Sequence, residues 1–167
     1  MAEAGLPILG FEPSCIGTLR DELPDLVPGP RARAVADAAI MVGEFLAAQE
    51  GLPEILAGRS AWVHTHCHEK AVGDATATAR LLRGLGAHVT PIESSCCGMA
   101  GSFGYEAEHE SVSMAMGEIS LFPTVRRAPE SSLVVANGFS CRAQIRDGTG
   151  RTAQHVIRLI TIQGTGG

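Results

Sequence analysis

The sequence lacks the features that mark several large classes of protein. None of its apolar runs reaches the roughly 18 residues that suggest a membrane-spanning helix. No charged segment followed by an apolar one opens the chain, which argues against a secretory signal peptide. The 13 basic residues are scattered and the formal net charge is -5, which argues against a nucleic-acid partner. We therefore expect a protein without a membrane span, a leader or a nucleic-acid ligand.

Cysteines are present, but without the pattern of a disulfide scaffold. There are five, an odd number, and they lack the dense regular spacing of small secreted domains. This usage favours a reducing, cytoplasmic compartment, where cysteine clusters bind metals or do redox chemistry. The length of 167 residues and the hydrophobic content of 45% predict one globular domain with a real core.

Short apolar runs alternate with helical patterns along the chain. We expect strands at residues 7–12, 60–65, 87–92 and 132–136. We expect helices at 14–27, 31–49, 75–85, after the loop 93–104, and at 152–161, before a frayed tail. This order predicts an α/β fold, a single domain with a mostly parallel, Rossmann-like sheet flanked by helices and right-handed crossovers.

Local signals define these helices more closely. Pro24 and Pro28 should end the first helix, and Asp74 should cap the third. The helix at 31–49 rests on an apolar stripe with helical spacing: Val35, Ala38, Ala39, Val42, Phe45 and Leu46. The helix after the loop should bury a stripe of three residues: Tyr105, Val112 and Met116.

Every cysteine follows an expected strand directly: Cys15, Cys67, the adjacent pair Cys96 and Cys97, and Cys141. The carboxyl ends of parallel strands meet along one edge of a sheet, where ligands bind. The 28 residues between Cys67 and Cys96, and the 43 between Cys97 and Cys141, each hold one helix and one strand. The spacing therefore predicts that Cys67, Cys96, Cys97 and Cys141 gather at one edge.

Four thiolates suit a [4Fe–4S] cluster. The glycines at 98, 101 and 104 would let the backbone approach such a group and aim N–H groups at sulfur. They do not form the Gly-x-Gly-x-x-Gly fingerprint of dinucleotide-binding proteins.

Other interpretations of the cysteines remain open. They could be inert buried thiols, because free cysteine is among the most buried residue types. They could bind zinc together with His64, His66 or His68, although in an extended segment these side chains would face away from Cys67. Thiol–disulfide exchange by Cys96 and Cys97 is disfavoured, because a disulfide between neighbours strains the peptide and no Cys-x-x-Cys is present.

Three motifs resemble the cysteine-rich CCG domain. This domain occurs in heterodisulfide reductases, in a subunit of glycerol-3-phosphate dehydrogenase, and in FAD-linked glycolate, D-lactate and D-2-hydroxyglutarate dehydrogenases. The motifs are His66-Cys67-His68-Glu69-Lys70-Ala71, Cys96-Cys97-Gly98-Met99-Ala100-Gly101-Ser102-Phe103-Gly104-Tyr105-Glu106 and Ser140-Cys141-Arg142-Ala143-Gln144-Ile145. The resemblance extends from about residue 7 to about residue 162, and is greatest to the C-terminal end of large FAD-linked oxidases.

The resemblance implies an organisation and a role. Family members usually carry two copies of the domain, so residues 1–57 would hold the end of a first copy, with Cys15 at its last corner and connecting helices. Residues 58–162 would form a whole second copy and 163–167 a tail. The chain would be an iron–sulfur electron-transfer module that passes electrons from FAD on another domain or subunit, which oxidises a 2-hydroxy acid, to a quinone or another carrier.

The sequence departs from the family pattern in two ways. That pattern often closes with Cys-x-x-Cys, but Gln144 stands three residues after Cys141, which argues against a five-cysteine, non-cubane cluster. The FAD domain and the Cys-x-x-Cys-x-x-Cys runs of a ferredoxin-like domain are missing, so both would be partners. By resemblance, this piece would not oxidise a substrate alone, and any attachment to the inner membrane would be through those partners.

Overall fold

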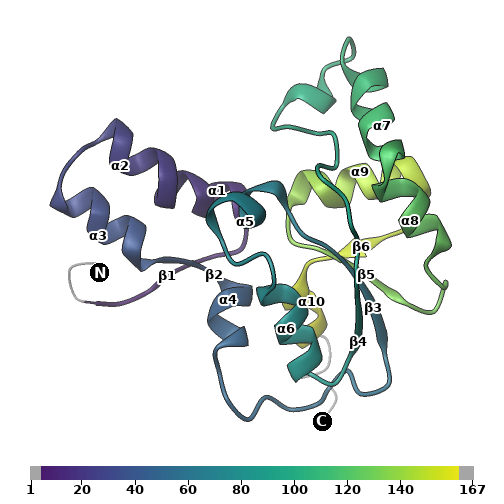
Figure 1. The fold of residues 1–167 in the computed structure, drawn as a ribbon, viewed down its shortest axis with the longest axis horizontal. Coiled ribbons are helices and arrows are strands. Elements are labelled where there is room, and N and C mark those ends of the chain that lie inside the picture. The colour runs from purple at the N-terminus through teal and green to yellow at the C-terminus, as the bar shows by residue number, and fades with distance from the viewer. Residues whose placement is uncertain (1–4, 162–167) are drawn as a thin grey trace.

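The computed structural model describes residues 5–161 and contains two parallel β-sheets (Figure 1). The larger sheet has the strand order β4-β3-β5-β6. Its strands are β3 (Ser60–His64), β4 (His88–Pro91), β5 (Leu133–Ala136) and β6 (Ala153–Gln154). The smaller sheet pairs β1 (Ile8–Gly10) with β2 (Ala39–Met41). The expected α/β fold with parallel strands flanked by helices is therefore confirmed.

Helices connect and cover these strands. Before β3 they are α1 (Pro13–Gly17), the π-helical turn η2 (Thr18–Glu22), α2 (Leu23–Leu26), α3 (Pro30–Ala38) and α4 (Val42–Ala47). Between β3 and β5 they are α5 (Cys67–Val72), α6 (Ala77–Gly84), the 3₁₀ turn η3 (Phe103–Tyr105), α7 (Glu110–Ile119) and α8 (Leu121–Arg127). After β5 they are α9 (Phe139–Thr149) and α10 (Val156–Thr161). Among residues 5–161, no helix combines the length and the apolar character that crossing a bilayer requires.

The side chains of β5 alternate between the two faces of the larger sheet, as the pleat of a strand requires. Leu133 and Val135 join a buried apolar cluster with residues of α6 and α10. Val134 and Ala136 join a second cluster with residues of α8 and α9, and this cluster includes Cys97 and Cys141. The two thiols therefore lie on the face of the sheet that α8 and α9 cover.

The helix expected at 31–49 is wrong, because a strand interrupts it. Residues Ala39–Met41 form β2, which pairs in parallel with β1 at Ile8↔Ala39 and Gly10↔Met41. The stripe predicted for this helix consequently belongs to three different elements. Pairing with a distant strand has overridden the local helical pattern, as tertiary contacts commonly do.

Other boundaries also differ from expectation. Pro24 does not end the first helix but lies in the first turn of α2, where a proline is tolerated. Thr76, not Asp74, is the N-cap of α6, although Asp74 Oδ1 accepts a hydrogen bond from the Thr76 N–H. The segment 152–161 begins with the short strand β6 before α10. The tail at 163–167 lies outside the described residues.

Tyr105 and Val112 are not buried, contrary to the expected stripe. Their exposed fractions are 56% and 51%. The buried residues of α7 are instead Ser113 and Gly117, and the Phe122 ring of α8 packs against Gly117 so closely that a Cβ there would overlap it. Two small residues of this helix are therefore fully buried, and Met114 packs against the core beside them.

Glu44 joins the N-terminal elements to the loop between α5 and α6. Its carboxylate accepts hydrogen bonds from the Arg20 guanidinium of η2, from the Met41 N–H at 3.2 Å and from the Asp74 N–H at 2.8 Å. Burial opposes the charged carboxylate, but Arg20 and the two N–H groups outweigh it, so the pKa of Glu44 is lowered.

Replacing Glu44 by glutamine is expected to destabilise the protein by about 1–3 kcal/mol at pH 7, because the hydrogen bonds from Arg20, Met41 and Asp74 lose their charged acceptor. A carboxyl with a lowered pKa stabilises the fold above its unfolded pKa of about 4.3, and this contribution is lost as the pH falls through the lower folded value. Urea unfolding should therefore show a smaller difference between Glu44→Gln and the parent at about pH 3. An equal difference at both pH values, or an equal effect of Glu50→Gln at the exposed Glu50, would contradict this role.

Candidate metal centre

The structure brings four of the five cysteines together from three strand-to-helix corners. Cys67 begins α5 after β3, the Cys96–Cys97 pair follows β4, and Cys141 lies in the first turn of α9 after β5. The Sγ atoms of Cys97 and Cys141 are 3.3 Å apart. The Cys96 thiol interacts electrostatically with both the Cys67 and the Cys97 thiol, so the four thiols form a continuous row of sulfur atoms.

A cavity of about 420 Å³ adjoins three of these four thiols. It is lined by Cys67, Cys96 and Cys97 and by residues of the loop that follows them, and Ser140 closes it from α9. The volume is more than ten times the roughly 30 Å³ that one water molecule occupies in the liquid. The site therefore has room for a group much larger than a single ion.

The thiols differ sharply in acidity. Hydrogen bonds with Cys67 and Cys97, together with the Gly98 N–H, lower the pKa of Cys96 well below its ordinary value. The contact with Cys96 raises the pKa of the Cys67 thiol, and the contact with Cys141 raises the pKa of the Cys97 thiol. The Cys97 thiol and the nearby His64 lower the pKa of Cys141 to about 5 despite its burial. The lowered pKa values favour the thiolate form of Cys96 and Cys141, and the raised ones favour the thiol form of their neighbours Cys67 and Cys97.

The three glycines of the loop after the cysteine pair contribute to the site in different ways. The Gly98 N–H donates to Cys96 Sγ at 3.3 Å, and the backbone of Ala100 also bonds to this sulfur. Gly98 has a φ of 102°, and a Cβ there would overlap the Ser113 carbonyl oxygen. Gly101 lines the cavity, whereas Gly104 packs against Met99 and Ser113 away from it. Of the three glycines, only Gly98 donates to sulfur through its own N–H.

The histidines do not continue an extended segment, so the condition under which they would face away from Cys67 does not hold. β3 ends at His64, and His66 is the N-cap of α5, where its Nδ1 accepts from the His68 N–H at 3.1 Å. His64 is buried, and its Nδ1 lies 2.8 Å from Ser94 Oγ. One ligand atom each from His64, Cys97 and Cys141 lie within 4.8 Å of one another. His64 could therefore join Cys97 and Cys141 in holding a metal ion.

A buried polar network supports the site from behind. Asn137, which follows β5, donates to Glu69 Oε1 and to Thr78 Oγ1, both at 2.8 Å. Glu69 also accepts from the His66 N–H at 2.9 Å. Burial raises the pKa of Glu69. The network ties the two corners that carry Cys67 and Cys141 to each other, so it fixes their relative position.

Three polar side chains beside the cysteines donate hydrogen bonds to backbone carbonyls of this chain. Lys70 donates to the Ser94 and Ser95 carbonyls just before Cys96. Arg142 donates to the Ala136 and Asn137 carbonyls at the end of β5. Gln144, in the place of a possible fifth cysteine, is buried and donates to the Ser113 carbonyl at 3.0 Å. These three residues position the corners of the site.

Cys15 is not among the gathered thiols. It is exposed on α1, although its neighbours Glu12 and Ser14 line the cavity. The corner that carries it lies close to the site, since Glu12 Oε2 accepts from the Phe139 N–H at 2.8 Å. Both Cys15 and Cys141 thus lie in the first turn of a helix that follows one strand of a parallel pair.

Sequence reasoning missed two residues of this site. Gly138 comes so close to the His66 ring that a Cβ there would overlap it, and the Cβ would lie 3.2 Å from Cys141 Sγ. Asn137 could have been noticed as a polar residue directly after a fully buried strand. No signal in the sequence marks Gly138 apart from the other glycines.

The chain is similar to parts of larger oxidoreductases. It is 29% identical over 164 residues to the D-2-hydroxyglutarate dehydrogenase of Escherichia coli (strain K12), covering 96% of this chain and 16% of that protein. It is 31% identical over 163 residues to a subunit of anaerobic glycerol-3-phosphate dehydrogenase from the same strain, covering 93% of this chain and 40% of that protein. A Pseudomonas putida D-2-hydroxyglutarate dehydrogenase is 27% identical, with 15% of its length covered.

These relatives include two of the kinds of protein that the cysteine motifs indicate. The chain spans between 15% and 40% of the lengths of the three relatives. No family model matches the chain. The chain is therefore similar to a portion of larger dehydrogenases, and this similarity alone assigns that portion no activity.

Proposed function

We propose that this chain is the iron–sulfur electron-transfer module of a larger FAD-linked 2-hydroxy-acid dehydrogenase. The observation that carries the proposal is the row of four thiols from three separate corners, which lies beside a cavity of about 420 Å³. In this proposal, Cys67, Cys96, Cys97 and Cys141 bind a [4Fe–4S] cluster. The similarity to D-2-hydroxyglutarate dehydrogenases supports the hydroxy-acid substrate of the whole enzyme.

The donor set fits this group. Iron–sulfur clusters are held by cysteine thiolates, typically four of them. The Gly98 and Ala100 N–H groups that bond to Cys96 are the kind of donor that tunes a cluster's reduction potential. When bound, the cluster would supply one-electron transfer, and the residues of this chain would hold it and exclude water from its inner side, where Cys97 and Cys141 are buried.

The partners follow from the same proposal. The flavin would reside on another domain or subunit, and a ferredoxin-like domain would carry further clusters. Electrons would pass through this module toward a quinone or another carrier. Cys15 would belong to a second, separate site, because its thiol lies outside the gathered four.

The proposal is tested by the iron, acid-labile sulfide and zinc contents of the chain purified without oxygen. About four iron and four sulfide per chain are expected for one cluster. Zinc without sulfide would reject the iron–sulfur assignment.

One observation favours a second candidate, a zinc-stabilised structural or interaction domain. The close set of His64, Cys97 and Cys141 offers the mixed nitrogen and sulfur donors that zinc prefers. Structural zinc sites, however, are closed and tetrahedral. The cavity beside the cysteines is larger than such a site needs, so the cluster is the better-supported group.

A further inference from the structure

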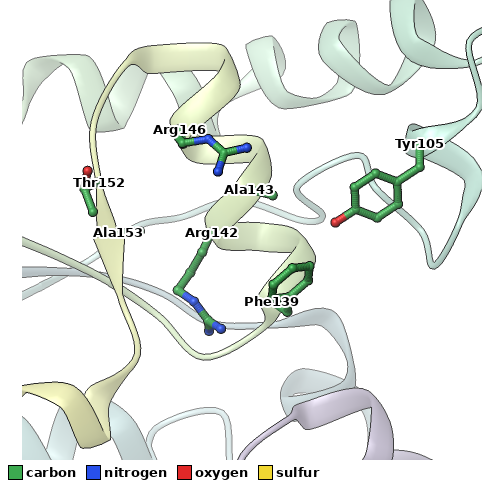
Figure 2. A pocket seen from close by; sticks show the side chains of 7 residues that line it. All are labelled: Tyr105, Phe139, Arg142, Ala143, Arg146, Thr152 and Ala153. Carbon is green, nitrogen blue, oxygen red and sulfur yellow. The ribbon is translucent and has the colours of Figure 1, made fainter.

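A second cavity, of about 320 Å³, lies on the face of α9 that points away from the thiols. Figure 2 shows Arg142 and Arg146 projecting from successive turns of this helix, with the Phe139 ring at its N-terminal end and the Tyr105 ring approaching from the side. Thr152 borders the cavity beside the edge strand β6. These five residues make up what we call the α9 surface.

The side chains of the α9 surface are of the kinds that protein interfaces use. Phe139 is 64% exposed and Tyr105 is 56% exposed, so neither aromatic ring contributes to the core. Tyrosine, phenylalanine and arginine are enriched at interfaces, and tyrosine and arginine dominate among the residues that contribute most to binding. The α9 surface therefore has the composition of a docking site for another protein.

The charge of the α9 surface identifies the occupant's chemistry. Arg142 and Arg146 lie four residues apart and so neighbour each other on one helix face, on a chain of net charge -5. The Arg146 guanidinium already binds a carboxylate, that of the adjacent Asp147, through bonds of 2.8 and 3.2 Å. An incoming carboxylate would replace Asp147 at this guanidinium.

The position of the α9 surface relates it to the candidate metal centre. Cys141 lies on the inner side of α9 and contacts Cys97, while its chain neighbour Arg142 lines the outer cavity. Ser140 lines the thiol cavity, and its neighbour Phe139 lines the outer one. The first turn of α9 is thus the wall between the two cavities.

We propose that the α9 surface docks an acidic polypeptide segment of a redox partner, with a carboxylate on Arg146, beside the positive charge of Arg142 whose Nη1 donates inward to the Ala136 and Asn137 carbonyls, and with its apolar side chains against Phe139 and Tyr105. That the docked partner exchanges electrons through the first turn of α9 rests on the proposed function; the docking itself does not. The surface is open and carries two exposed rings, which suits a polypeptide better than a small anion, since small ligands are largely enclosed in their pockets.

The test uses the metal-free 167-residue chain, labelled with ¹⁵N, and a peptide of eight glutamates containing one central tyrosine. The amide signals of residues 139–146 and of Thr152 should shift on titration, and added salt should weaken binding. Arg146→Glu should weaken binding about tenfold, whereas the matched control Arg83→Glu on α6 should not. Asp147→Asn should tighten binding severalfold, because it removes the internal competitor, whereas Asp25→Asn on α2 should not.

Three results would overturn the docking proposal. The first is a set of shifts away from the α9 surface. The second is an Arg83→Glu variant that binds as weakly as Arg146→Glu. The third is an Arg146-dependent response to inorganic phosphate, or to vesicles containing phosphatidylglycerol, without a response to the peptide. Because the chain in this test holds no metal, a failed iron assignment would leave these outcomes unchanged, and a failed docking test would leave the iron assignment unchanged.

Discussion

Replacing Cys97 by serine is expected to abolish iron binding after anaerobic reconstitution. Cys97 is 4% exposed and lies in the middle of the row of thiols, in contact with both Cys96 and Cys141. A serine hydroxyl is not deprotonated at neutral pH and is a poor ligand for iron compared with a thiolate. Iron and acid-labile sulfide should therefore fall from about four each per chain to near zero.

The matched control for this variant is Cys15→Ser. Cys15 is exposed and lies outside the gathered thiols, so its replacement should leave the iron and sulfide contents of this site unchanged. Circular dichroism should show that both variants keep their helices, because a serine fills nearly the same volume as a cysteine. Full iron and sulfide retention in a folded Cys97→Ser protein would refute the assignment.

Replacing Gly98 by alanine is expected to cost about 3 kcal/mol or more of the free energy of unfolding. The φ of 102° is strained for any residue with a Cβ, which by itself costs about 1–3 kcal/mol. The new methyl group would also overlap the backbone carbonyl of Ser113, so the cysteine loop and α7 would have to move apart. Urea unfolding measures this loss directly.

Gly101→Ala provides the comparison that separates strain from overlap. Gly101 also has a positive φ, 69°, but a Cβ there would meet nothing within 4 Å. Its replacement should therefore cost only about 1 kcal/mol. Equal losses for the two variants would show that the close contact between Gly98 and Ser113 is unimportant. Of the two, Gly98→Ala should also impair iron incorporation more, because relieving the overlap with Ser113 would shift the backbone N–H that donates to Cys96 Sγ.

The gathering of the cysteines was predictable because it follows from topology. Each one comes directly after a strand, and parallel strands present their carboxyl ends at one edge. The prediction needed only the positions of β3, β4 and β5, which short apolar runs mark clearly. It did not need the helix boundaries, several of which were wrong. The binding of a metal by these thiols remains a prediction.

The division of residues 31–49 could not be predicted from local pattern. Its apolar spacing suits a helix, and only the hydrogen bonds from β2 to β1, about 30 residues earlier, convert Ala39–Met41 into a strand. The exposure of Tyr105 was missed for a related reason. Its position suggested a buried stripe, but α7 begins only at Glu110 and turns Ser113 and Gly117 toward the core.

The role of His64 also depends on structure beyond the sequence pattern. A strand that continued through residue 68 would have turned the histidines away from Cys67. The chain instead bends after His64, and His66 caps the new helix. His64 itself is the last residue of β3 and lies beside Cys97 and Cys141.

The claim that the thiols of three distant corners hold one inorganic group is tested most directly by anomalous diffraction at the iron absorption edge, from crystals of the reconstituted chain grown without oxygen. We predict one anomalous peak within bonding distance of the Sγ atoms of Cys67, Cys96, Cys97 and Cys141. A peak elsewhere, such as at the exposed group of Glu106, Glu108 and His109, with none among the four sulfur atoms, would contradict this claim.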